Sequence, residues 1–350
     1  MRFMAFSLLS AVLLLSSRPA YAQASLFYLE AQAVGGYSSA AREAIYYSMT
    51  QDDAMQKPSV GFDWLQRLSG EGRDFGVIGV QARLAYNHEP DREVELQLYN
   101  AWFRYKAGLA DIWIGHDRPA LGLSSYFDSH GLLLPTLAMM GWGFDRDWGV
   151  GFSRDFSWGN LTGSLTTGSG MPIYSKGNYL ASARIAKGVL ERDNFNLGLS
   201  AAWGEILETM GYELMSDDPE PFQVVSIDFT FLWTRFESRI EGMAGERMIK
   251  NDPTCAFFWR LTMNLLEENR LKLETQPVLW EETSELRFTM SAGVSYQVTA
   301  DLALRAMYQH IHAREDHDII VIPALRSLYP NIDAEEDNRI VFQVYYYGGI

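Results

Sequence analysis

The fold is decided by the stretch ELRFTMSAGVSYQV, residues 285–298, in which large or apolar side chains occupy every second position. Leu286 and Phe288 begin the apolar series, whereas the intervening Arg287 and Thr289 are polar. A period of two is that of a β-strand with one apolar and one polar face. The stretch is therefore predicted to be a strand that meets an apolar medium on one side and water on the other.

Residues 1–22 have the features of a secretory signal peptide that is removed after export. Arg2 gives a positive start, residues 4–15 are an apolar run, and Ala20 and Ala22 place small side chains at both cleavage-site positions. The chain is therefore predicted to leave the cytoplasm, and its predicted destination, the cell outer membrane, depends on the strand pattern of the mature chain.

The mature chain, residues 23–350, is expected to form a single domain, because no repeat, low-complexity tract or linker divides it. Its longest apolar run, residues 131–143, contains Pro135 and is shorter than the roughly 20 residues that a membrane-spanning helix needs. Any membrane crossing is therefore expected to be by strands. Alternation and turn signals predict sixteen of them, near residues 26–35, 58–68, 75–87, 93–105, 110–118, 147–154, 160–168, 179–187, 195–205, 222–232, 235–244, 255–265, 270–279, 285–298, 301–312 and 339–348.

The connections between these segments separate into two alternating sets. Short turns and longer loops at opposite ends are typical of an outer-membrane barrel with periplasmic turns and outer loops. The prediction is thus an all-β, closed, antiparallel up-and-down transmembrane β-barrel of sixteen strands. The short set is 69–74, 106–109, 155–159, 188–194, 233–234, 266–269 and 299–300, and the other set includes 36–57, 119–146, 206–221 and 313–338.

Side-chain chemistry assigns the two faces of the strands. In residues 222–232, Val225 and Ile227 alternate with Ser226 and Asp228, so the first pair is expected to face lipid and the second a watery interior. A cationic side chain on the lipid face at mid-depth costs about 2 to 4 kcal/mol. An inward direction is therefore expected for the charged row Arg235, Glu237, Arg239 and Glu241, although an exposed face of a soluble sheet is the alternative.

Charge and cysteine content exclude several classes of function. Removing Arg2 and Arg18 with the signal peptide changes the formal net charge from −15 to −17, which argues against a nucleic-acid partner. The single cysteine, Cys255, excludes an internal disulfide and a cysteine zinc cluster.

A few histidines were considered as metal ligands. His310 and His312 share one face of a strand end, and His317 lies between Asp316 and Asp318, a spacing that suits a divalent cation. The alternative is that these side chains are simply solvated near an outer loop. The prediction is that the chain has no metal site and no cofactor.

The run DIWIGHDRPALG, residues 111–122, leaves a predicted strand and enters the longest outer loop. It looks like the strand that leads into the constriction loop of the sixteen-stranded porins of Gram-negative outer membranes, and the mature chain resembles these porins in pattern. The resemblance implies that the third outer loop, residues 119–146, folds into the barrel and narrows it. It also implies contact with outer-membrane lipid, insertion by the outer-membrane assembly machinery, and a capacity to form a homotrimer. Acidic outer loops, such as the one with Asp217, Asp218 and Glu220, could hold divalent cations that bridge to lipopolysaccharide, or could simply stay solvated.

Acids on such a loop and arginines on the facing wall would create a transverse field that orders permeating dipoles and sets ion preference. Asp117 and Asp128 would supply the acidic side, and three inward arginines the basic side. In the alternative interpretation the arginines merely neutralise lumen carboxylates. The predicted pore-lining and constriction residues are Arg83, Glu95, Asp117, Asp128, Asp228, Glu237, Arg239 and Arg260.

These features predict a porin, a water-filled channel for passive diffusion of small hydrophilic solutes or ions, without a chemical step. Three other classes stay open: an outer-membrane hydrolase of the phospholipase kind, a non-conducting barrel that is a scaffold for a partner protein, and a solute-specific channel. A hydrolase would need Ser and His side chains together at the barrel rim. No such constellation stands out in the sequence, so no catalytic residue is predicted.

Overall fold

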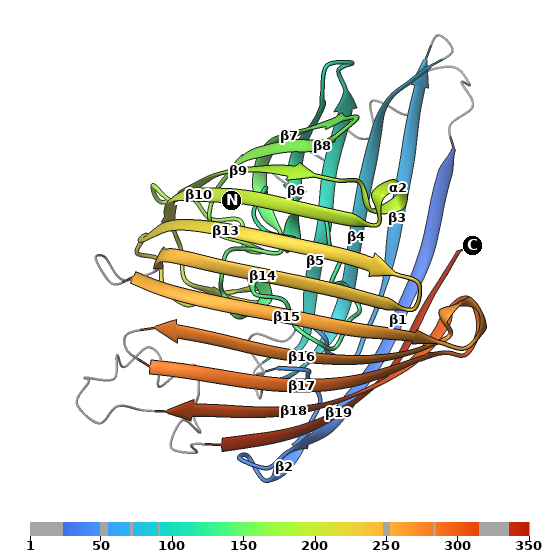
Figure 1. Ribbon diagram of the computed structural model, residues 1–350, viewed down its shortest axis with the longest axis vertical. Helices are drawn as coiled ribbons and strands as arrows, with labels where there is room; N and C mark the ends of the chain where they lie inside the picture. The colour runs from blue at the N-terminus through green and yellow to red at the C-terminus, as the bar shows by residue number, and fades with distance from the viewer. Residues whose placement is uncertain are drawn as a thin grey trace.

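The structure, a computed structural model, describes residues 24–49, 55–70, 73–89, 92–247, 253–282, 285–314 and 336–349. Sixteen long strands pair with their sequence neighbours in antiparallel order, and the ring closes where β1 pairs with β19 (Figure 1). The near wall in Figure 1 carries β13 to β19, and β3 to β6 lie behind it. The predicted signal peptide, residues 1–22, lies outside the described residues and stays a prediction.

Each of the sixteen predicted strands is confirmed, with ends that differ by a few residues. The long strands are β1 Ser25–Ser38, β3 Ser59–Gly70, β4 Arg73–Glu89, β5 Arg92–Lys106, β6 Asp111–Asp117, β7 Asp147–Phe156, β8 Gly159–Thr166, β9 Tyr179–Lys187, β10 Phe195–Ile206, β13 Glu220–Trp233, β14 Phe236–Arg247, β15 Pro253–Leu265, β16 Leu271–Glu282, β17 Glu285–Gln297, β18 Leu302–Arg314 and β19 Glu336–Gly349. Short elements that the sequence did not predict are β2 Glu43–Ile45, β11 Thr209–Met210, β12 Glu213–Leu214, α2 Leu190–Asp193 and three 3-10 turns at Leu123–Ser125, Ala138–Met140 and Glu267–Asn269.

The predicted separation of short turns from long loops is also confirmed. At the turn end the longest connection is the one between β9 and β10, residues 188–194, which contains α2. At the loop end, loop 3 between β6 and β7 comprises residues 118–146 and is the longest connection. Loop 1 comprises residues 39–58 and includes β2. Among the described residues, no helix is long and apolar enough to cross a membrane.

The two faces of the strands differ in exposure as predicted. On β13 the side chains of Val225 and Ile227 are 57% and 58% exposed, whereas Asp228 is 1% exposed. An apolar outer surface of this kind is stable against lipid rather than water. Glu241 of β14 is buried inside, whereas Arg235 precedes that strand and is exposed at the turn, so it is not part of the charged row on the strand.

A β-bulge interrupts the alternation in β5. Gln81 of β4 is opposite Asn100, and the next residue, Ala82, is opposite Leu98, so Tyr99 has no partner in the ladder. A bulge inserts one residue into one strand and redirects its side chain. Tyr99 is 1% exposed, and Asn100 donates to the Gln81 side chain at 2.8 Å. Two consecutive residues of β5 therefore face the interior.

The lipid-facing surface predicts a depth-dependent cost for added charge. Ile227 is at the middle of β13, so Ile227→Arg should lower the free energy of unfolding by about 2 to 4 kcal/mol, because the cation must be buried in hydrocarbon. Trp233, at the turn end of the same strand, is 65% exposed and is the matched control. Trp233→Arg should cost roughly 0 to 1 kcal/mol. Equal costs for the two variants, measured by denaturant unfolding from lipid vesicles, would contradict the assigned membrane position.

Candidate functional site: a loop folded inside the barrel

Loop 3 runs inside the barrel, as predicted, and its backbone is hydrogen-bonded to wall side chains. The Ala120 N–H donates to the Ser182 hydroxyl of β9 at 3.1 Å, and the Gly122 N–H donates to the Ser200 hydroxyl of β10 at 3.0 Å. Leu123 continues the series, with its N–H 2.7 Å from the carboxylate of Glu241 on β14. Buried backbone donors need partners, and here small or acidic inward side chains of successive strands provide them.

The second half of the loop is held mainly by arginines. Arg260 of β15 donates to the carbonyl oxygens of Leu134 at 2.8 Å and Pro135 at 3.2 Å. Arg305 of β18 donates to the carbonyl oxygen of Gly131 at 2.8 Å. Hydrogen bonds from a charged donor are stronger than neutral ones. The loop is thus fastened to opposite parts of the barrel wall.

Apolar contacts fill the space between loop 3 and one part of the wall. Burying apolar side chains stabilises the protein by roughly 25 cal/mol per Å² removed from water. Where loop 3 lies against β9 to β16, the interior of the barrel is therefore a packed apolar core and not a water-lined surface. The buried members from the loop are Leu121, Leu123, Leu137 and Trp142, and those from the wall are Leu180, Ala202, Ile206, Phe222, Val224, Met243, Ala256, Phe258 and Val278.

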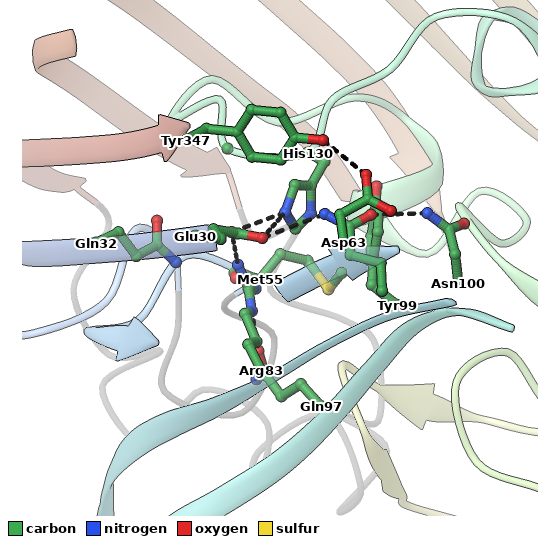
Figure 2. Close-up of polar contacts among 12 residues, drawn as sticks. Glu30, Gln32, Met55, Asp63, Arg83, Gln97, Tyr99, Asn100, His130 and Tyr347 are labelled. Carbon is green, nitrogen blue, oxygen red and sulfur yellow. Dashed lines mark hydrogen bonds and ion pairs between the residues drawn. The ribbon is translucent and has the colours of Figure 1, made fainter. Parts of the chain in front are cut away.

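The turn of loop 3 at His130 contacts the strand that closes the barrel. The His130 Nε2 atom lies 2.8 Å from both carboxylate oxygens of Glu30 on β1, and Figure 2 shows the two side chains facing each other. Arg83 of β4 lies 3.3 Å from the same carboxylate. The ring of Tyr99, redirected by the bulge, is centred 4.2 Å from the His130 ring. The loop is therefore fixed to β1 and β5 as well, and Arg83 of β4 supports the Glu30 carboxylate that His130 contacts.

A buried ion pair of the barrel wall contacts loop 3 at Tyr126, four residues before His130. Arg184 of β9 donates to both carboxylate oxygens of Asp228 on β13, at 2.6 and 2.9 Å. The Tyr126 hydroxyl of loop 3 donates to the same carboxylate at 3.1 Å, and the Arg184 guanidinium lies 4.5 Å from the centre of the Tyr126 ring. Asp228 is one of the predicted site residues, whereas Arg184 was not predicted. The alternation in β9 would have allowed this prediction, because Arg184 and Ser182 are two residues apart and therefore lie on the same, inward face of the strand.

The other predicted site residues form local pairs around the loop. Each acid of the set has a basic neighbour, and the pairs lie on several strands rather than across one open gap. The contacts are Glu95 with Lys57 at 3.3 Å, Asp117 with Arg104 at 2.9 Å, Asp128 with Arg118 at 2.9 Å and with Arg146 at 3.7 Å, and Glu237 with Arg239 at 2.9 Å.

Exposure distinguishes Asp128 from the other predicted residues. Within loop 3, all of which the structure describes, Asp128 is the only exposed residue, with a side chain 59% accessible. The side chains of Arg83 and Asp228 are at most 1% accessible. Asp128 is therefore the predicted charge most open to water inside the barrel.

Loop 1 also enters the barrel, which was not predicted from the sequence. Arg83 donates to the carbonyl oxygen of Met55, and Arg339 of β19 donates to that of Met49. Methionine fills irregular gaps and leaves no periodic signal in a loop sequence, so this contact was not predictable from alternation. A buried cluster joins loop 1 to loop 3 and β5, and its members are Met49, Met55, Tyr99 and Met139.

Three of the described histidines contact carboxyl or amide groups, whereas His116 of β6 is buried and its ring stacks on that of Trp148, with 4.8 Å between the ring centres. His130 contacts Glu30, and the His310 ring lies 3.0 Å from the Asn338 side-chain oxygen. His312 lies 3.7 Å from Glu336. His317 and its flanking acids lie outside the described residues. Within the described ranges, no group of three or more His, Cys, Asp or Glu side chains is arranged to hold a metal ion.

Comparison with known proteins shows the architecture. No known protein family matches the sequence, and no curated protein matches it. Among solved structures, the chain is similar to the anion-selective porin from Comamonas acidovorans, with 9% identity and a TM-score of 0.62 over 93% of this chain and 100% of that one. It is also similar to the trimer form of OmpT, an outer membrane protein of Vibrio cholerae, with 11% identity and a TM-score of 0.59 over 94% and 100%. A third is Salmonella typhi OmpF in complex with daunomycin, with 9% identity and a TM-score of 0.59 over 93% and 97%.

These likenesses confirm the predicted resemblance to sixteen-stranded porins at the level of fold. The chain is a closed antiparallel barrel of the outer-membrane type. At this level of identity the comparison concerns the fold alone, so the activity has to be argued from the loop and the wall.

The Arg184–Asp228 pair predicts a large, recoverable loss of stability. Arg184→Met should lower the free energy of unfolding by about 3 to 5 kcal/mol, because it leaves a buried carboxylate without its cation. Adding Asp228→Leu should restore most of that loss, since no charge is then left unpaired. The control is Arg192→Met at the turn before β10, where the exposed pair with Asp193 at 2.7 Å should contribute far less. Denaturant unfolding checks the series, and a double variant no more stable than Arg184→Met would contradict the assignment.

Proposed function

We propose that this chain is an outer-membrane porin, a water-filled channel through which small hydrophilic solutes or ions diffuse passively, with no chemical step. The observation that carries the proposal is that loop 3 lies inside a closed barrel and exposes one charged side chain, Asp128, to the lumen. A loop that narrows the barrel and presents a charge is a means of selecting solutes by size and sign.

In this proposal, the eight predicted lining residues divide into two groups. Asp128 acts on passing ions directly, and Glu95, Glu237 and Arg239, with side chains 14 to 17% accessible, add to the field near the wall. The remaining residues position the loop by forming buried bonds, and they are Arg83, Asp117, Asp228 and Arg260.

The charge of Asp128 is expected to persist at neutral pH. The surrounding protein displaces water from the Asp128 carboxylate, which by itself raises its pKa, but the Arg118 and Arg146 guanidiniums outweigh this effect and hold the pKa below its usual value. A carboxyl with a lowered pKa stays ionised above its usual pKa and is neutralised only in more acidic solution. Its influence on ions should therefore be constant from neutral pH down to mildly acidic pH.

A second candidate is a non-conducting barrel that serves as a scaffold. The entry of both loop 1 and loop 3 into the interior, with a shared buried cluster, favours it. The hydrolase alternative has less support, because His130, His310 and His312 contact carboxylates or an amide, and the buried His116 stacks on the Trp148 ring. Hydrolysis of a phospholipid by purified protein, lost on replacing one Ser or His, would support that alternative.

A homotrimer is the proposed assembly. One solved relative of the same fold is a trimer form, and the apolar outer surface of this barrel can be covered by a second copy as well as by lipid. Mass measurement of the detergent complex should give three chains.

Planar-bilayer recording tests the channel proposal. The wild-type protein should show discrete steps of ohmic current, and their absence in correctly folded protein would favour the scaffold. In a salt gradient, Asp128→Asn should move the reversal potential toward that of the anion. One unit charge acts on an ion 4 Å away with about 1 kcal/mol in water, so its removal should lower the cation permeability and raise the anion permeability by up to about fivefold each, and the cation-to-anion ratio should fall. Asp193→Asn, at an exposed turn outside the lumen, is the control and should leave the ratio unchanged.

A further inference from the structure

Two wall arginines face each other directly inside the barrel. Arg239 of β14 and Arg260 of β15 are register partners on adjacent antiparallel strands. Like charges directly opposite each other are destabilising. Arg239 is paired with Glu237 at 2.9 Å, whereas the hydrogen bonds of Arg260 go to the neutral oxygens of Gln276, Leu134 and Pro135. Two guanidiniums accompanied by one directly bonded carboxylate form a site that attracts anions.

The ring of Phe127, in loop 3, occupies this position. The Arg239 guanidinium lies 4.4 Å from the ring centre and the Arg260 guanidinium 5.2 Å from it. The negative face of an aromatic ring attracts cations within about 6 Å. A ring can therefore stabilise the two like charges without contributing a charge of its own.

The residues on either side of Phe127 hold the ring in place. Tyr126 is bonded to Asp228 and Thr230 of β13, at 3.1 and 2.8 Å, and Asp128 is paired with Arg118 at 2.9 Å. The backbone of the segment is thus fixed at both ends. The position of the ring follows from the fold of loop 3 and is not a chance surface contact.

We propose that Arg239 and Arg260 form a latent anion-binding site and that Phe127 determines the ion preference of the passage by covering it. This inference rests on the proposed channel function. The ligands that the open site would take are small anions with several oxygen atoms, such as phosphate and carboxylates, because guanidinium groups bind them through paired N–H donors. With the ring in place, such anions pass without contacting the pair, and Asp128 is the main charge that they meet.

Removing the ring should expose the pair. In Phe127→Ala the chloride-to-potassium permeability ratio is expected to rise about threefold to tenfold over wild type, because a cation next to the path favours anions. Inorganic phosphate should then reduce the chloride current of Phe127→Ala at concentrations that leave wild type unaffected. Phe127→Leu keeps an apolar cover over the arginines, so it should change the ratio less than Phe127→Ala.

Two further variants identify the cause. Phe144→Ala makes the same chemical change in the same loop, at a ring that packs against the apolar cluster of loop 3, and should leave the ratio at the wild-type value. Arg239→Gln combined with Phe127→Ala should abolish the inhibition by phosphate, because one of the two guanidiniums is then missing. Circular dichroism establishes that each variant retains its strands.

A chemical measurement separates this inference from the channel proposal. Phenylglyoxal modifies accessible arginine side chains, and mass spectrometry of the folded protein in detergent should show Arg239 modified several-fold faster in Phe127→Ala than in wild type or Phe144→Ala. If wild type does not conduct, the porin proposal fails, and the labelling rates still decide whether Phe127 covers the pair. Conducting Phe127→Ala channels with the wild-type permeability ratio, or equal labelling of Arg239 in all variants, would overturn the inference.

Discussion

The structure depends on one constraint: a backbone that lies within hydrocarbon must satisfy its N–H and C=O groups inside the protein. The sixteen long strands meet it by closing the sheet, with β1 paired to β19 from Tyr28 and Gly349 to Ser38 and Arg339. Closure also sets which side chains face lipid, because a shift of one residue would move every side chain to the other face. Buried Asp228 and exposed Ile227 on β13 are consequences of that register.

The same constraint explains the polar residues on the inner wall. Loop 3 has no neighbouring strand to pair with, so its backbone groups bond to wall side chains. Ser182, Ser200 and Glu241 accept from its N–H groups, and Arg260 and Arg305 donate to its carbonyl groups. Inward arginines such as Arg260 and Arg305 therefore have a structural role, because they hold loop 3 in place inside the barrel.

The strands could be predicted from the sequence because their signal is local and repeated. Alternation in each segment, together with loop lengths, was sufficient to locate all sixteen. The inward position of loop 3 was implied by the resemblance to porins, and its glycine-rich and apolar composition agrees with that position. The bulge at Tyr99 could not be predicted, since one additional residue in β5 leaves the composition of the strand unchanged. The pairing of Arg184 with Asp228 depends on two strands separated by β10, and the sequence contains no information about heights in the barrel. Loop 1 was missed because its contacts with the wall use carbonyl oxygens, which every residue has.

The distribution of charge inside the barrel follows from these two roles of polar side chains. Charges that fasten the loop are buried and paired, as Arg83 is with Glu30 and Arg184 with Asp228. A buried pair has little influence on an ion in the lumen, because its opposite charges lie about 3 Å apart and their fields largely cancel at a distance. Asp128 is also paired, with Arg118 at 2.9 Å, but 59% of its side chain is accessible, so an ion can approach its carboxylate closely enough for the two fields not to cancel. In the proposed channel, ion preference should therefore be determined by the few charges that loop 3 leaves uncovered, and by the aromatic side chains that the loop places over the wall arginines.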